Sequence, residues 1–153
     1  DFFRSSEIVL NDDDIIFSAA NSTYSYDLPS GYVNWKQDVA SIGTPIINQE
    51  NVFLVTSNGY FLNLDKETGK IVWSINTFKN LGKKKSLTRA TGFVMGSGKI
   101  YITTLNGKLI ICSASSGEVE TIKKIGDTIT APPIINNGSI FLLTENSRIL
   151  GFK

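Results

Sequence analysis

The stretch from Thr44 to Asn76, TPIINQENVFLVTSNGYFLNLDKETGKIVWSIN, decides the fold class. It contains three short runs rich in β-branched and aromatic residues, then a glycine and a fourth run that contains Trp73. Such runs, separated by turn residues and free of a helical period, are typical of β-strands. Asn58-Gly59 is a pair favoured in two-residue type I′ hairpin turns, and Gly69 can take positive φ in a longer turn. The stretch therefore predicts four consecutive strands.

The same order of runs and turns recurs in residues 7–35, 92–121 and 132–153. A period of about 40 residues with four strands in each copy is typical of β-propeller blades. We therefore predict an all-β fold: a β-propeller segment of about four four-stranded antiparallel blades, half of a propeller of about eight blades, with the last blade incomplete. The expected blades are residues 5–39, 43–76, 89–126 and 129–153 of a single segment, 1–153. The structural repeat positions are Asp27, Gly31, Trp35, Asp65, Gly69, Trp73 and Gly117.

Packing between the blades follows from the two faces of a sheet, which both need covering, so that blades are expected to stack face to face. We expect Trp35 and Trp73 to pack between adjacent blades, where a tryptophan buries about 150–250 Å². Thr121 occupies the corresponding position of the third copy. Looser packing is therefore expected at that junction.

Residues that usually carry catalysis are scarce. The chain has no histidine and a single cysteine, Cys112, within an apolar run. This excludes Ser-His-Asp and Cys-His nucleophilic mechanisms and the usual zinc sites, and Cys112 is expected to act as a small buried hydrophobe. The run Asp12-Asp13-Asp14 lacks the glycine and the distal glutamate of a calcium loop, which favours a solvated turn. We expect no catalytic residue, no metal site and no cofactor.

The charge of the chain favours neither nucleic acid nor membrane as a partner, since the formal net charge is +1 and no apolar run approaches the ~20 residues that cross a bilayer. The most basic segment is the insertion 77–88, between the second and third copies. Two interpretations of it stay open: a solvated loop, or a contact with an acidic partner or anionic surface. The candidate partner-binding residues are Lys79, Lys83, Lys84, Lys85 and Arg89.

A family resemblance adds to these patterns. Residues 62–73, LNLDKETGKIVW, resemble the repeat of PQQ-type propellers, and the stretches 34–64, 91–119 and 129–153 are similar to the C-terminal half of the BamB family, propeller lipoproteins of the outer-membrane β-barrel assembly machinery. The resemblance implies a non-enzymatic scaffold, periplasmic and associated with the outer membrane, that binds the central barrel-assembly protein. It also implies a lipid anchor in a missing half of the protein.

Other functions and assemblies stay open. The alternatives are the propeller of a quinoprotein dehydrogenase, which usually needs a vicinal cysteine pair, and an envelope binding propeller of unrelated role. Four blades in an open arc would leave two apolar blade faces uncovered. We expect a fragment of a longer protein, a homodimer that completes the ring, or a closed ring in which residues 1–4 pair beside residues 148–152.

Overall fold

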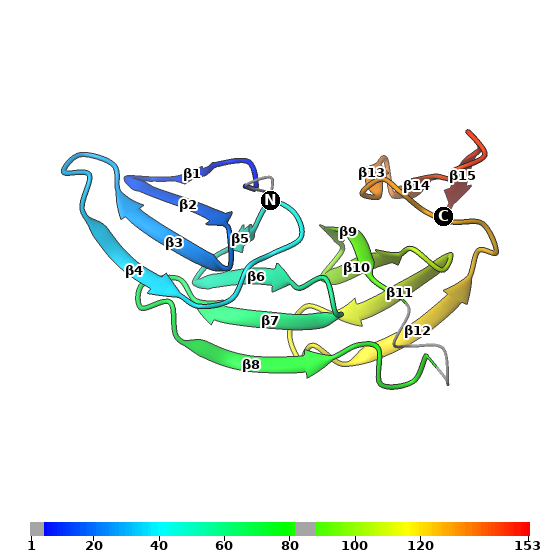
Figure 1. The fold of residues 1–153 in the computed structure, drawn as a ribbon, viewed down its shortest axis with the longest axis horizontal. Helices are drawn as coiled ribbons and strands as arrows, with labels where there is room; N and C mark the ends of the chain where they lie inside the picture. Colours follow the sequence, from blue (N-terminus) through cyan, green and yellow to red (C-terminus); the bar gives the residue numbers. More distant parts are fainter. Residues whose placement is uncertain (1–4, 82–87) are drawn as a thin grey trace. The chain divides into compact units, whose positions relative to one another are not determined.

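The computed structural model describes residues 5–81 and 88–153, and every regular element among them is a strand (Figure 1). The strands form four antiparallel sheets, three with four strands and the last with three. Neighbouring strands of each sheet are also neighbours in the sequence. The predicted all-β fold of four-stranded sheets with an incomplete last sheet is therefore confirmed.

We call the sheets blades 1 to 4. Blade 1 contains β1 (Val9–Asn11), β2 (Asp14–Ala19), β3 (Ser22–Asp27) and β4 (Val33–Gln37). Blade 2 contains β5 (Ile46–Asn48), β6 (Asn51–Val55), β7 (Tyr60–Asp65) and β8 (Ile71–Asn76). Blade 3 contains β9 (Ala90–Gly96), β10 (Lys99–Thr104), β11 (Lys108–Ser113) and β12 (Val119–Lys124). Blade 4 contains β13 (Ile134–Asn136), β14 (Ser139–Leu143) and β15 (Ile149–Phe152).

The chain divides into two compact units, and the boundary between them runs through blade 2. The first comprises Asp1–Thr56 and Phe61–Ser74, and the second comprises Ser57–Tyr60 and Ile75–Lys153. The first unit therefore holds blade 1 and most of blade 2, whereas the second holds blades 3 and 4.

The core of the first unit lies between blades 1 and 2. Its buried residues are Ile16, Trp35, Val52, Leu54, Leu62 and Leu64. Those of blade 2 share one face, because the register pairs Val52 with Leu64 and Leu54 with Leu62, and paired residues point to the same side of a sheet. We call this packed face of blade 2 its leading face, and the packed face of blade 1 its trailing face.

The second unit repeats this arrangement. Leu109 of blade 3 is buried with Ile140 and Leu142 of blade 4 and with Ile129, which precedes β13. Tyr101 and Ile111, which pair with each other in blade 3, pack around the same cluster. The trailing face of blade 3 thus covers the leading face of blade 4, as blade 1 covers blade 2.

One turn recurs between the third and fourth strands of the first three blades, at Asp27–Gly31, Asp65–Gly69 and Ser113–Gly117. In each, the glycine N–H donates to the carbonyl oxygen four residues earlier, at 2.8, 2.8 and 2.9 Å. The three glycines have φ values of 73°, 67° and 76°, which glycine adopts without the strain that other residues meet. The three repeated glycines therefore adopt the same backbone conformation in the same kind of turn.

The aspartates of this turn cap its backbone. The Asp65 carboxylate accepts hydrogen bonds from the Thr68 N–H at 2.8 Å and from the Thr68 hydroxyl at 2.6 Å. The Asp27 carboxylate accepts the corresponding bonds from Ser30, with the N–H at 2.8 Å. Because these bonds favour the ionised form, they hold the pKa of both carboxyls below its ordinary value. Ser113 stands at the same position of blade 3 without a charge.

Trp35 joins the two blades of the first unit through the turn of blade 2. Its indole N–H donates to the Lys66 carbonyl at 2.7 Å, and its ring covers Gly69 so closely that a Cβ there would lie 2.4 Å away. Only 7% of Trp35 is exposed, which confirms its predicted packing between adjacent blades. Trp73 packs edge-on against Phe61 of its own blade, with ring centroids 4.8 Å apart.

The hairpin between β6 and β7 differs from the expectation. A type I′ turn needs positive φ at both central residues, whereas only Gly59 has it here, at 83°. Val55 pairs with Phe61, so the connection is longer than two residues. The type I′ prediction for Asn58-Gly59 is therefore wrong. A Cβ at Gly59 would lie 2.4 Å from the Phe78 ring, so tertiary packing favours the glycine here.

Replacing Gly69 by alanine should destabilise the protein more than the same change at Gly31. Both changes force a positive φ on alanine, which costs about 1 kcal/mol, but the Cβ at Gly31 meets nothing within 4 Å. We expect the free energy of unfolding to fall by about 1 kcal/mol for Gly31→Ala and by about 3 kcal/mol or more for Gly69→Ala, which displaces the Trp35 ring. Urea denaturation followed by circular dichroism measures both values. Equal losses would contradict the docking of Trp35.

Cys112 should make stability fall at high pH. It is fully buried in β11, and burial raises the pKa of its thiol to about 12 from 9.0. Between these values the folded state keeps a proton that the unfolded state releases, so stability is full below pH 9 and is lost as pH rises toward 12. The urea midpoint should therefore drop more from pH 8 to 10 for the protein than for Cys112→Val, which retains every other titrating group. Parallel pH profiles would refute this assignment.

Candidate protein-binding surface

The beginning of the basic segment is fixed to the hairpin between β6 and β7. The Thr77 N–H and hydroxyl both donate to the Gly59 carbonyl, at 2.9 and 2.7 Å. Phe78 is buried with its ring over Gly59, and Leu81 is also buried. Lys79 is exposed between these two apolar side chains. The segment thus starts as a short anchored turn that presents a cation.

The end of the segment is fixed as well. The Ala90 N–H donates to the Ser57 carbonyl at 2.9 Å, and the Arg89 carbonyl accepts the Leu105 N–H at 2.9 Å. The Arg89 side chain is exposed. The Lys108 ammonium donates to the Leu81 carbonyl at 3.3 Å, so this lysine holds the segment and is itself part-buried. Both ends of the insertion are therefore tied to the second unit.

The predicted partner-binding residues fall into two groups. Lys79 and Arg89 lie at the anchored ends of the segment, and neither is ion-paired with an acidic side chain of residues 5–81 or 88–153. Lys83, Lys84 and Lys85 lie outside the described residues. What the structure adds is the anchoring by Phe78, Leu81 and Lys108, which sequence reasoning missed. Phe78 and Leu81, two apolar residues in an otherwise mostly polar loop, are the sequence feature that could have indicated this anchoring.

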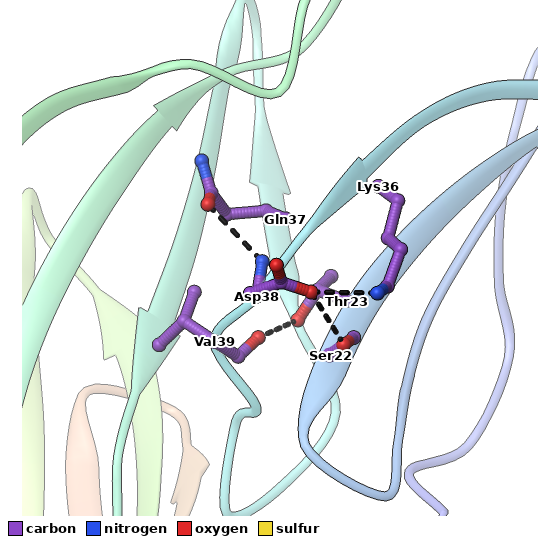
Figure 2. A network of polar contacts seen from close by, with 6 residues as sticks. All are labelled: Ser22, Thr23, Lys36, Gln37, Asp38 and Val39. Carbon is purple, nitrogen blue, oxygen red and sulfur yellow. Dashed lines mark hydrogen bonds and ion pairs between the residues drawn. The ribbon is translucent and has the colours of Figure 1, made fainter.

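A second polar cluster lies where the chain leaves blade 1 (Figure 2). Asp38 Oδ1 contacts the Lys36 ammonium at 2.7 Å and accepts the Ser22 hydroxyl at 3.2 Å, while the Thr23 hydroxyl donates to the Val39 carbonyl at 2.7 Å. The hydrogen bond between Lys36 and Asp38 lowers the pKa of Asp38 and raises that of Lys36. The bonds from Ser22 and Thr23 join β3 to the chain that follows β4.

Buried hydroxyls continue this cluster inward. Thr23 Oγ1 lies 2.6 Å from Ser18 Oγ, which also accepts the Ser41 N–H at 3.2 Å. The Ser18 N–H in turn donates to Ser6 Oγ at 2.9 Å. These bonds satisfy polar groups that would otherwise be buried without partners, so their role is to hold the chain segments before and after blade 1.

The acidic run is a turn, as the sequence predicts. Asp12 has a φ of 53° between β1 and β2, the Asp13 carbonyl accepts the Leu28 N–H at 2.6 Å, and Asp14 accepts the Asn34 side-chain amide at 2.8 Å. No group of three or more potential metal-ligating side chains converges in the described part of the chain. None of its elements is a helix long and apolar enough to span a membrane.

A hollow of about 130 Å³ lies in the second unit. It is lined by Tyr101 and Ile111 of blade 3 and by Ile140 and Phe152 of blade 4. Thr121, in the place of a repeat tryptophan, pairs with Ile111 and cannot supply an indole on this face. The hollow agrees with the looser packing expected at this junction.

Comparison with known proteins shows which family the repeat resembles. A family model described as "Outer membrane protein assembly factor BamB" matches residues 4–75. The "Outer membrane protein assembly factor BamB" of Moranella endobia (strain PCIT) is 26% identical over 145 residues, which cover 88% of this chain and 37% of that protein. This chain therefore resembles BamB and its PQQ-like propeller repeat. It spans 30–40% of the length of the curated relatives that it matches.

Solved structures share the fold. BamB from Moraxella catarrhalis superposes with a TM-score of 0.72 at 14% identity, over 96% of this chain and 45% of that one. The quinohemoprotein alcohol dehydrogenase from Comamonas testosteroni gives a TM-score of 0.77 at 17% identity, over 91% of this chain and 28% of that one. The likeness to the BamB structure confirms the predicted fold class, a partial β-propeller. The quinohemoprotein alcohol dehydrogenase shares this fold.

Phe78→Ala should loosen the start of the basic segment. It removes a ring that is 4% exposed and leaves a cavity over Gly59, so we expect the free energy of unfolding to fall by about 3–5 kcal/mol. The matched control Ile71→Ala removes a side chain that is 47% exposed and should cost less than about 1 kcal/mol. Urea denaturation compares the two. If Phe78→Ala costs no more than the control, Phe78 is not the anchor.

Proposed function

We propose that this chain is a non-catalytic protein-binding segment of a bacterial envelope propeller, acting in the periplasm at the outer membrane as part of outer-membrane protein assembly. The observation that carries the proposal is the match to the BamB model over residues 4–75, together with relatives named as BamB that cover 80–89% of the chain. In this proposal residues 5–39, 43–76, 89–126 and 129–153 are successive blades of one scaffold, and membrane attachment comes from a lipid anchor outside this chain.

The contact surface in this proposal is the basic segment. Lys79 and Arg89 are exposed cations without an acidic partner among the described residues, and Lys83, Lys84 and Lys85 lie between them in the sequence. Anchoring of both ends lowers the conformational entropy that binding would remove. A cluster of cations on such a segment fits an acidic surface of a protein partner and increases the rate of encounter.

The second candidate is the cofactor-binding propeller of a quinoprotein dehydrogenase, which the likeness to the quinohemoprotein alcohol dehydrogenase favours. Such a protein would bind pyrroloquinoline quinone. Against it stands the cysteine content of this chain, which holds one cysteine and no vicinal pair.

A binding titration should separate the two candidates. By isothermal titration calorimetry, we expect saturable binding to the periplasmic repeats of the central barrel-assembly protein and no heat with pyrroloquinoline quinone. The variant Lys83→Glu/Lys84→Glu/Lys85→Glu should bind about tenfold more weakly, since like charges would then face each other. The control Lys70→Glu/Lys123→Glu/Lys124→Glu changes the net charge equally at exposed positions elsewhere and should bind as the unmodified protein does.

Each result has a definite meaning. Absence of binding by the folded protein would overturn the scaffold proposal for this chain, and binding of the quinone would replace it with the second candidate. Equal weakening by both triple variants would retain the partner but remove the basic segment as its contact.

A further inference from the structure

Three Asn-Gly pairs occur in the sequence, at residues 58–59, 106–107 and 137–138. Asparagine is a chemically labile residue. It is most labile before glycine, because the backbone nitrogen of the next residue can attack the side-chain amide and glycine has no side chain to obstruct the attack. The reaction is favoured where that nitrogen and the asparagine side chain are exposed and free of hydrogen bonds. The three pairs differ sharply in these respects.

The pair Asn137-Gly138 is open to water. The two residues form the turn between β13 and β14, with φ values of 47° and 71°, and both are exposed. Within residues 5–81 and 88–153, no hydrogen bond holds the Gly138 N–H or the Asn137 side chain. The attacking nitrogen and its target are therefore both accessible.

The pair Asn106-Gly107 is held closed. Gly107 is buried and donates its N–H to the Thr104 carbonyl at 3.0 Å. The Asn106 side-chain oxygen accepts the Thr104 hydroxyl at 2.7 Å. Both groups that must react are thus engaged by a single threonine.

The glycine of the third pair, Asn58-Gly59, is also enclosed. Gly59 is buried beneath the Phe78 ring, and its carbonyl accepts two hydrogen bonds from Thr77. Attack by the Gly59 nitrogen would require this anchored turn to open first.

The exposure of Asn137 follows from its place within a blade. The turn between the first and second strands has positive φ at its first residue in every blade, at Asp12, Gln49, Ser97 and Asn137, and both of its residues are exposed each time. Blades 2 and 3 have a blade before and after them in the chain, and their turns are exposed nonetheless. The exposure of this turn is therefore not a result of blade 4 being the last.

We propose that Asn137 is a site of spontaneous isoaspartate formation. The Gly138 nitrogen gives its proton to hydroxide and bonds to Cγ of Asn137. The Cγ–Nδ2 bond then breaks, and ammonia leaves after taking a proton from water, so that a five-membered succinimide remains in the chain. Water adds to either carbonyl carbon of this ring and breaks its bond to the nitrogen, which yields aspartate or isoaspartate. The turn must open briefly for the attack, and an exposed turn after a strand of three residues opens at low cost.

Isoaspartate at this position weakens blade 4. It places one extra carbon in the main chain, whereas a turn of two residues sets the register that pairs Asn136 with Ser139. Only three residue pairs join β13 to β14, so the loss of one matters. The isoaspartate form should therefore unfold at a lower urea concentration than Asn137→Asp, which carries the same charge on an ordinary main chain. This inference does not depend on the function proposed above.

Peptide mapping of the protein after incubation at mildly alkaline pH tests the site. Trypsin places the three pairs in separate peptides, 37–66, 100–108 and 125–148, and electron-transfer dissociation distinguishes isoaspartate from aspartate. In the folded protein we expect Asn137 to react about tenfold or more faster than Asn58 and Asn106, a difference of about 1.4 kcal/mol in activation free energy. In urea all three should react at similar rates, because each is then followed by an equally accessible glycine.

Two matched variants test the attack by the Gly138 nitrogen. Gly138→Ala should slow the reaction of Asn137 about tenfold or more, because the new methyl group obstructs that nitrogen. Gly98→Ala, in the equivalent turn of blade 3, should leave the rate unchanged. Both glycines have a φ of 71°, and a Cβ on either meets nothing within 4 Å, so the two variants carry the same backbone strain.

Three results would overturn the proposal. The first is equal reaction of the three asparagines in the folded protein, and the second is an unchanged rate in Gly138→Ala. The third is equal slowing by both alanine variants, which would mean that backbone strain and not direct attack sets the rate. An isoaspartate form with the same urea midpoint as Asn137→Asp would refute the weakening of blade 4.

Discussion

Every blade is a thin sheet with two apolar faces, and the need to cover both faces governs the rest of the structure. Within each unit one blade covers the next, and Trp35 shows how the fit is fixed: its ring lies on the Gly69 backbone while its N–H bonds the Lys66 carbonyl. The ring can approach this closely because Gly69 has no side chain, and the indole N–H finds its acceptor in the same turn. The packing of blade 1 on blade 2 therefore depends on the geometry of the turn that contains Gly69.

The repeated turn explains why the sequence predicts so much of the fold. Asp65 and Gly69 act locally, through bonds within five residues, so their pattern is visible without knowledge of tertiary contacts. The hairpins are less predictable, since positive φ at both central residues occurs at Ser97-Gly98 and Asn137-Gly138 and not at Asn58-Gly59. At Gly59 the Phe78 ring, distant in sequence, leaves no room for a Cβ.

The candidate surface was only partly predictable for the same reason. Its cations are plain in the composition of the segment 77–88 and in Arg89, which follows it. Its anchors depend on the contact of Phe78 with Gly59 and on the bond from Lys108 to the Leu81 carbonyl. Such contacts join residues 19 and 27 positions apart, which no local pattern reveals.

The order of the strands has a consequence for how the chain folds. Because each strand pairs only with its neighbours in the sequence, contact order within a blade is low and each hairpin can close before the next is complete. Low contact order favours fast folding, and in a chain of such repeats folding can begin in one blade and spread to the next.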